Sequence, residues 1–128
     1  MADMTITITI PLPPPTNSLY INLPKGKGRA KSAKYARWIP YAGAVARHLA
    51  AGKRIGGLYS FTMYLPDGIR GDWDSRLKAG LDLLAAFGIT DDDRFCRDIH
   101  ILWRPKSFFA EKDTCTISVC EWKKPVSD

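Results

Sequence analysis

Polar and apolar residues alternate in two segments of this chain. Residues 5–10 repeat Thr-Ile three times, which is the period of two expected for a strand with one buried face. Residues 58–65 alternate in the same way, with Tyr59, Phe61 and Met63 on one face. The pattern predicts two strands whose apolar sides face a core. Further strands are expected at residues 95–103 and 114–121.

Two segments between the strands have helical signals instead. Ser32 is a candidate N-cap for a first helix, because its side chain can accept a backbone N–H of the first turn. Pro40 interrupts this pattern and is expected to kink or divide the helix, with residues 41–51 as the second piece. A second helix is expected at residues 74–87, ended by Gly88. Its buried stripe is expected to contain Leu77, Leu81, Leu84 and Ala85.

The predicted order of elements is β-α-β-α-β-β within a single domain of residues 1–128. This order favours an α+β fold, with a mixed sheet and helices packed mainly on one face. The prolines of residues 11–15 end the first strand, because proline cannot donate to a strand ladder. Residues 19–31 are rich in Gly and Lys and are expected to form a surface loop. Hydrophobic residues make up 45% of the chain, which is enough for the core of such a fold.

Charge is distributed unevenly along the chain. The formal net charge is +6, from 19 Lys and Arg against 13 Asp and Glu, and this excess suits an anionic partner. The basic stretch of residues 25–37 contains no acidic residue, whereas acidic residues concentrate within residues 67–98. A metal-dependent nuclease needs both a basic and an acidic region, since cationic side chains bind phosphates and carboxylates bind the metal. The residues expected to contact DNA are Lys25, Lys27, Arg29, Lys31, Lys34 and Arg76.

The composition argues against several classes of protein. Cys96, Cys115 and Cys120 are odd in number and lack C-x-x-C spacing, which disfavours a disulfide framework or a zinc site. No apolar run approaches the ~20 residues that a membrane span requires. The N-terminus lacks the basic and apolar segments of a secretory signal. We therefore expect a cytoplasmic protein with reduced cysteines and no membrane partner.

The segment Asp72-Trp73-Asp74 is the strongest candidate for chemistry. At the end of an extended segment residues i and i+2 point the same way, so Asp72 and Asp74 can present two carboxylates to one ion. Mg²⁺ prefers such oxygen ligands and keeps several waters, so two or three carboxylates suffice. Lys78 lies one helical turn beyond Asp74 and could hold the scissile phosphate. The attacking group would be a water activated by the metal.

Each of these signals also has a purely structural interpretation. Asp74 could cap a helix and Lys78 could be an ordinary i,i+4 partner, because D-x-D is a common pattern. The acidic run of residues 91–93 could be a solvated turn, and the basic stretch could be a flexible surface. Taken one at a time, the acidic residues favour the structural interpretation. The functional one requires Asp93 to meet Asp72 and Asp74 in space.

Three segments form an ordered set of motifs. Residues 13–20 read P-P-P-T-N-S-L-Y, residues 72–82 read D-W-D-S-R-L-K-A-G-L-D, and residues 88–94 read G-I-T-D-D-D-R. In this order they resemble the P-P-(S/T)-x-N-x-x-Y, D-x-D-N-x-x-K-x-x-x-D and G-(I/V)-x-x-D-D-x motifs of the RusA family of Holliday-junction resolvases. The likeness runs over about residues 8–119. Ser75 departs from it by replacing the family's Asn, and a hydroxyl cannot make the two-ended contacts of an amide.

The resemblance implies a specific activity and site. RusA-like proteins are homodimers that bind four-way DNA junctions and make paired nicks in opposite strands with Mg²⁺ or Mn²⁺, and they often come from phages and prophages. The residues carried over by position are Asp72, Asp74 and Asp93 as metal ligands and Lys78 as the catalytic lysine. By the same comparison Asp91 would be a bystander, and Asp92 would have a supporting role.

The length of the second helix raises a question about this site. As a helix, residues 74–87 would span roughly 20 Å at about 1.5 Å per residue, and Asp93 follows the far end. Asp93 must either loop back to Asp72 and Asp74 or meet those residues of another chain. Two such helices packed antiparallel about a two-fold axis would give a site shared between subunits, which we state as a hypothesis.

Three functions remain open from the sequence. The first is a Mg²⁺-dependent, structure-selective endonuclease that resolves Holliday junctions by paired nicks. The second is a non-catalytic DNA-binding module whose acidic residues are caps and turn residues. The third is a nuclease that acts on other branched DNA, such as flaps or forks. Acidic residues in the family positions favour a nuclease over a binding module, since a binder has no reason to keep acids near DNA.

Overall fold

Residues 4–15, 20–26, 28–69 and 73–125 are described by a computed structural model of the chain. Within these residues the helices are α1 (Ala33–Ala50) and α2 (Trp73–Ala86), and the short 3-10 turns are η2 (Pro24–Gly26), η3 (Asp93–Phe95) and η4 (Lys106–Phe108). The strands are β1 (Thr5–Pro11), β2 (Tyr20–Asn22), β3 (Arg29–Lys31), β4 (Tyr59–Pro66), β5 (Cys96–Arg104) and β6 (Thr114–Glu121). In this part of the chain neither helix is long and apolar enough to cross a membrane.

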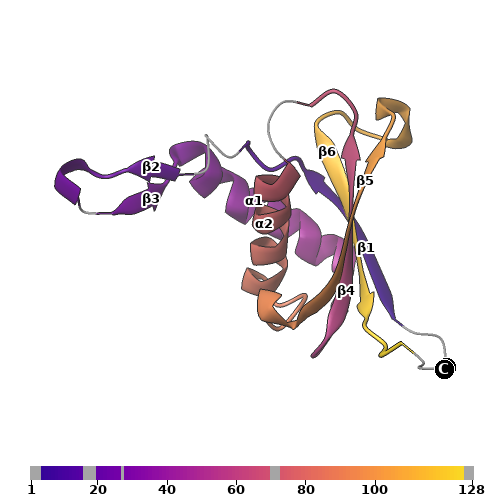
Figure 1. Ribbon diagram of the computed structural model, residues 1–128. Coiled ribbons are helices and arrows are strands. Elements are labelled where there is room, and N and C mark those ends of the chain that lie inside the picture. Colours follow the sequence, from indigo (N-terminus) through magenta and orange to yellow (C-terminus); the bar gives the residue numbers. More distant parts are fainter. Residues whose placement is uncertain (1–3, 16–19, 27, 70–72, 126–128) are drawn as a thin grey trace.

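Four strands form one mixed sheet in the order β1-β6-β4-β5. Strand β6 runs antiparallel to both neighbours, β1 and β4, whereas β4 and β5 run parallel. Helix α2 is the crossover that parallel strands require. Figure 1 shows α1 and α2 together on one side of the sheet. The expected α+β domain, with a mixed sheet and helices on one face, is therefore confirmed.

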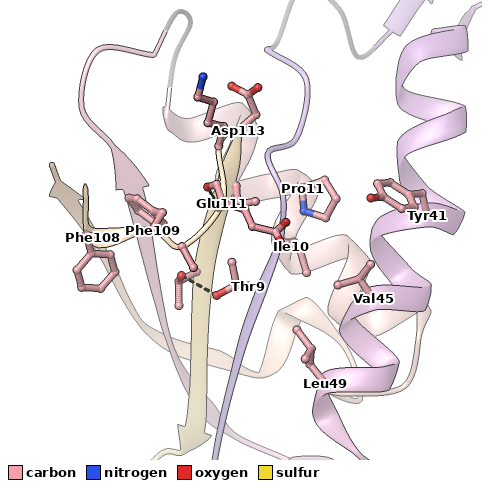
Figure 2. Close-up of a pocket in the computed structure, with 14 residues that line it drawn as sticks. Thr9, Ile10, Pro11, Tyr41, Val45, Leu49, Phe108, Phe109, Glu111 and Asp113 are labelled. Atoms are coloured by element: carbon pink, nitrogen blue, oxygen red, sulfur yellow. Dashed lines mark hydrogen bonds between the residues drawn. The ribbon is translucent and has the colours of Figure 1, made fainter. Parts of the chain in front are cut away.

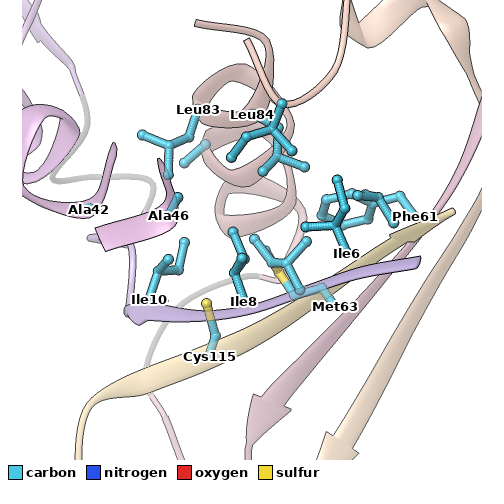
Figure 3. Close-up of a cluster of buried hydrophobic side chains, with 14 of the residues drawn as sticks. Ile6, Ile8, Ile10, Ala42, Ala46, Phe61, Met63, Leu83, Leu84 and Cys115 are labelled. Carbon is cyan, nitrogen blue, oxygen red and sulfur yellow. The ribbon is translucent and has the colours of Figure 1, made fainter. Parts of the chain in front are cut away.

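The alternating residues point as the sequence predicted. Ile6, Ile8 and Ile10 of β1 are at most 3% exposed, and Phe61 and Met63 of β4 are fully buried. Figure 3 shows these side chains between the sheet and the side chains of α1 and α2. Burial of one such side chain contributes about 1.5–3 kcal/mol. The period of two therefore identified the core side of both strands.

The opposite side of the sheet carries hydroxyl groups. The side-chain oxygens of Thr7 and Ser118 lie 3.3 Å apart, and those of Thr9 and Thr116 lie 3.0 Å apart. Each pair stands directly opposite in the β1–β6 register and shares a hydrogen bond. Polar side chains remain hydrogen-bonded in water, so this face needs no helix to cover it.

Helix α1 begins where the sequence predicted but is not divided. The Ser32 side chain accepts a hydrogen bond from the Tyr35 backbone N–H at 3.1 Å, which confirms the N-cap. The helix runs through Pro40 without a break, which corrects the expectation of two pieces. Pro40 and Ala36 are both exposed, so the Ala36 carbonyl that loses its N–H partner can be solvated.

Helix α2 is confirmed, but its buried face differs from the expected stripe. Leu84 is the one fully buried member of that stripe, and the half-buried members are Leu77, Leu81 and Ala85. The buried face instead includes Gly80. A Cβ added at Gly80 would lie 2.7 Å from Met63 Cε and 3.3 Å from Ile117 Cδ1. The missing side chain therefore lets α2 approach β4 and β6 closely, which leucine spacing alone does not reveal.

The Gly- and Lys-rich segment contains a hairpin. Strands β2 and β3 pair antiparallel, with Asn22 opposite Arg29. The Leu23 backbone N–H donates to the Gly28 carbonyl at 2.8 Å and closes the turn. Figure 1 shows the hairpin extending away from the sheet and from α2. The expectation of a surface segment is confirmed and that of a loop without strands is wrong, because strands of three residues are too short to show alternation.

The three cysteines are free thiols. Burial raises the pKa of the fully buried Cys115 thiol to about 12. Burial likewise raises the pKa of the half-buried Cys96 thiol to about 11. Both thiols are therefore protonated and weakly reactive near neutral pH, as expected for reduced cysteines.

We expect Gly80→Leu to destabilise the fold by about 1–3 kcal/mol, because the larger side chain does not fit between α2 and the sheet. Thermal unfolding followed by circular dichroism measures this as a lower Tm. Ala86→Leu is the matched control, since Ala86 is exposed in the same helix and leucine is nearly as good a helix former as alanine. Equal Tm values for the two variants would contradict the close contact at Gly80.

Candidate active site

The candidate site begins in the first turn of α2. Asp74 is exposed there, and its Oδ1 accepts a hydrogen bond from the Ser75 backbone N–H at 2.9 Å. The N–H groups at a helix N-terminus carry partial positive charge and favour a carboxylate. Because α2 begins at Trp73, Asp74 lies inside the helix and does not cap it. Asp72, the other half of the D-x-D pair, lies outside the described residues.

Lys78 follows Asp74 after one turn of α2 and pairs with Asp82 a further turn along. Lys78 Nζ lies 3.6 Å from Asp82 Oδ2, and the two side chains are 62% and 37% exposed. An exposed pair of this kind contributes at most about 1 kcal/mol, so the ammonium can exchange its partner for a phosphate. The sequence-based ligand set left out Asp82, although its i,i+4 spacing from Lys78 placed it in the same row.

A turn after α2 sets the position of the acidic run at residues 91–93. Gly88 has a left-handed φ of 74°, and the Ile89 backbone N–H donates to the Leu84 carbonyl at 2.9 Å. The Ile55 backbone N–H then donates to the Ile89 carbonyl at 2.8 Å. These bonds hold the turn against the segment that follows α1, so the acidic run has a defined place beside α2.

Asp91 has a structural role in this turn. It forms an ion pair with Arg54 and accepts a hydrogen bond from the Gly57 backbone N–H at 2.9 Å. The Gly57 hydrogen bond is the main cause that lowers the pKa of Asp91 below its ordinary value, and Arg54 adds to it. A carboxylate committed to these partners is not free to bind a metal.

Asp92 and Asp93 lie at the start of η3. Asp92 Oδ1 accepts a hydrogen bond from the Arg94 backbone N–H at 3.0 Å, and this bond lowers the pKa of Asp92. Asp93 is exposed, and its pKa is raised first by a hydrogen bond with Asp92, then by partial burial and by the charge of Asp82. The Lys78 ammonium acts in the opposite direction on the same pKa. Asp93 therefore lies within electrostatic reach of Asp82 and Lys78.

One chain does not gather the expected ligands in its described part. Asp93 lies near Asp82, which is eight residues beyond Asp74 and so about 12 Å farther along the axis of α2. Among the described residues, which leave out Asp72, no three His, Cys, Asp or Glu side chains are close enough to hold a metal ion. Of the expected metal ligands that the structure describes, Asp74 therefore lies in the first turn of α2 and Asp93 lies beside its far half.

The basic residues expected to contact DNA lie mostly on the hairpin and the start of α1. Lys25 is in η2, and Lys27 lies outside the described residues. The exposed members of the set are Arg29, Lys31 and Lys34. Arg76 is 3% exposed, and its Nε donates to the Pro13 carbonyl at 3.2 Å. This corrects the expectation for Arg76, which holds the proline-rich segment against α2 instead of facing a DNA backbone.

A hollow of about 840 Å³ lies between α1, β1 and the segment around η4. Figure 2 shows Tyr41, Val45 and Leu49 of α1 on one side of it and Glu111 on the other. The hollow is at the β1 edge of the sheet, whereas Asp93 precedes β5 at the opposite edge. None of the expected site residues lines it, so it is a separate surface.

We expect Asp82→Asn to lower the pKa of the Asp93 carboxyl, because it removes a negative charge that favours the protonated form. Lys78→Met should raise the same pKa, since it removes a positive charge. A ¹³C NMR titration of labelled carboxyl groups measures both shifts. An Asp93 pKa that responds to Asp74→Asn and not to Asp82→Asn would contradict this placement and put Asp93 at the start of α2.

No protein-family model and no curated protein matches this chain.

Proposed function

We propose that this protein is a Mg²⁺-dependent endonuclease of the RusA type that cuts branched DNA, with four-way junctions as its substrate. The observation that carries the proposal is the pair Asp74 and Lys78, exposed one turn apart at the start of α2. A carboxylate for a divalent cation and an ammonium for a phosphate, at this spacing, suit phosphodiester hydrolysis. The order of the sequence motifs points to the same activity.

The chemistry of the acidic residues suits Mg²⁺, with Mn²⁺ as the alternative. Asp74 and Asp93 are exposed and offer the hard oxygen ligands that these ions prefer. Asp72, Asp74 and Asp93 are the residues that would hold the ion. When bound, the ion supplies activation of the attacking water and neutralises charge on the phosphate.

Lys78 has the role of binding the scissile phosphate. Its side chain and that of its partner Asp82 are both solvent-accessible, so a phosphate can displace the carboxylate. A positive charge at this point stabilises the negative charge that develops on the phosphate during hydrolysis. Ser75 stands in place of the family's Asn, and its backbone N–H donates to Asp74 Oδ1.

The β2–β3 hairpin is the DNA-binding arm in this proposal. Arg29 and Lys31 are exposed on β3, and Lys34 continues the series in the first turn of α1. Basic side chains on a projecting arm can follow a phosphate backbone without reading base sequence. Such contacts suit an enzyme that selects DNA by its shape.

The separation of Asp74 from Asp93 favours a site shared between the subunits of a homodimer. An ion with short metal–oxygen bonds, about 2.0–2.1 Å for Mg²⁺, cannot bridge the separation of about 12 Å along α2 between Asp74 and Asp82, which lies beside Asp93. Two antiparallel copies would bring the Asp93 end of one chain to the Asp74 end of the other. The homodimer would then carry two equivalent sites, as paired nicks in opposite strands require.

We expect Asp74→Asn to reduce cleavage of a labelled synthetic four-way junction by about 100-fold or more, because it removes a metal ligand at nearly constant size. Wild-type protein should nick opposite strands symmetrically in Mg²⁺, leave a matched linear duplex intact and be inactive in EDTA. Denaturing gels of the labelled strands measure this. Glu111→Gln is the matched control, since Glu111 is exposed beside the separate hollow and should keep full activity.

Other outcomes of this experiment would support the other functions. Junction binding without cutting, unchanged by Asp74→Asn, would make the acidic residues structural and the protein a DNA-binding module. That second candidate is supported by Asp91 and Asp92, whose carboxylates already have structural roles at Arg54 and at the start of η3. Preferential cutting of flaps or forks would keep the nuclease and change its substrate.

Mixed dimers of Asp72→Asn and Asp93→Asn chains test whether the site is shared. Each variant alone should be inactive. A mixed dimer should recover nicking of a single strand, because one of its two sites keeps all of its carboxylates. Two different affinity tags isolate the mixed dimer for the junction assay, and a complete lack of recovery would place the whole site within one chain.

A further inference from the structure

Strand β5 is an edge of the sheet, and its outer side has no partner strand among the described residues. It is nine residues long, and no proline interrupts it. A row of unpaired N–H and C=O groups of this length is a template for pairing with another strand. The β1 edge differs, because α1 packs along it and Trp38 Nε1 donates to the Pro11 carbonyl at 2.9 Å. The less protected edge is therefore β5.

Strand β5 also carries apolar side chains that no described helix covers. Ile99 and Trp103 are 47% and 42% exposed. They stand beside Phe61 and Leu65 in the β4–β5 register, so they lie on the helix-covered face of the sheet. Helix α2 contacts β4 and β6 at Gly80, which leaves this face of β5 open. Exposed apolar residues on an unpaired edge are typical of an interaction surface.

We propose that β5 pairs antiparallel with β5 of a second copy of this chain, about a two-fold axis at Ile101. In this register Ile99 lies opposite the partner's Trp103, so the two exposed apolar residues cover each other. Asp98 lies opposite the partner's Arg104, on the open face of the sheet. The surface is thus complementary to itself in its apolar residues and in its charges, as an isologous dimer requires.

Other registers lose this complementarity. Opposite residues of an antiparallel pair lie on the same face of the joined sheet. A shift by one residue would therefore place the helices of the two copies on opposite faces of that sheet, and Ile99 would no longer meet the partner's Trp103. A two-fold axis at His100 would set Asp98 opposite the partner's Leu102, without an opposite charge. Strand β4 pairs regularly with residues 98–104, and Ile101 is the centre of that segment.

Both charged side chains are already held on the open face. Asp98 accepts a hydrogen bond from the Ser60 hydroxyl at 3.1 Å. The Arg104 guanidinium carbon lies 5.4 Å from the centre of the Tyr64 ring. Side chains that are ordered before association lose less conformational entropy when the interface forms.

The same pairing would complete the proposed active site, a consequence that rests on the proposed function although the interface itself does not. Pro66 of β4 stands opposite Arg104, so α2 begins at the end of the sheet where β5 finishes. Turn η3 precedes β5 and lies at the other end. Antiparallel pairing therefore brings the partner's Asp93 to the end of the sheet that carries Asp74.

Sedimentation velocity of the protein without DNA or metal tests the interface. Wild-type protein should be a dimer, and Ile99→Lys should be a monomer, because it places a charge in the apolar part of the contact. Leu49→Lys is the matched control, since Leu49 is also 47% exposed but lies on α1 beside the separate hollow. A monomeric wild type, a dimeric Ile99→Lys or a monomeric Leu49→Lys would overturn the proposal, with circular dichroism establishing that each variant is folded.

Charge reversal tests the register. Asp98→Arg and Arg104→Asp should each raise the dimer dissociation constant by about tenfold or more, because like charges would then lie opposite each other. The double variant should return the constant toward the wild-type value, and a double variant as weak as the single ones would overturn this register. Sedimentation contains neither DNA nor metal, so it tests the interface independently of the nuclease activity. If the protein forms the β5 dimer but does not cut DNA in the junction assay, the proposed nuclease is wrong and the interface stands.

Discussion

The close contact of α2 with β4 and β6 at Gly80 determines which side chains of α2 and β5 are exposed to solvent. Without a side chain at that position, the helix rests over the middle of the sheet and not over β5. The contact buries Leu84 and turns Asp74 and Lys78 toward solvent. It also leaves the inner face of β5 uncovered. One packing constraint therefore leaves exposed both the pair Asp74 and Lys78 on α2 and the apolar residues on β5.

The length of α2 is the second constraint, because a helix cannot shorten to bring its ends together. Asp74 lies in the first turn of α2, and Asp93 lies beside Asp82, which is about 12 Å farther along the helix axis. In the proposed dimer, the two-fold axis brings the Asp93 carboxylate of one subunit toward Asp74 of the other. Metal binding would then depend on association, so that an isolated subunit would not cut DNA. Two sites related by the same axis would face the two strands of one junction together.

Adjacent residues of one charge acquire different roles in this fold. Within the acidic run, Asp91 is committed to Arg54 and Gly57, Asp92 caps η3, and Asp93 stays exposed. The difference arises from the partners that the turn brings to each carboxylate and not from the carboxylates themselves. The basic residues divide in the same way, since the hairpin cations are exposed and Arg76 is buried. A charged residue in the sequence is thus a candidate metal ligand or DNA contact. Its burial and its partners in the fold decide whether it is available for that role.

The sequence by itself determined the elements whose signals are local. Alternation identified β1 and β4, Ser32 identified the start of α1, and the i,i+4 spacing placed Asp74 and Lys78 on one face of α2. Only the tertiary structure decided which face of α2 is buried, that Arg76 lies inside, and that Asp93 is beside the far half of the helix. The physical reason is that these features depend on contacts between residues distant in the chain, such as Gly80 against β6, which no local pattern encodes.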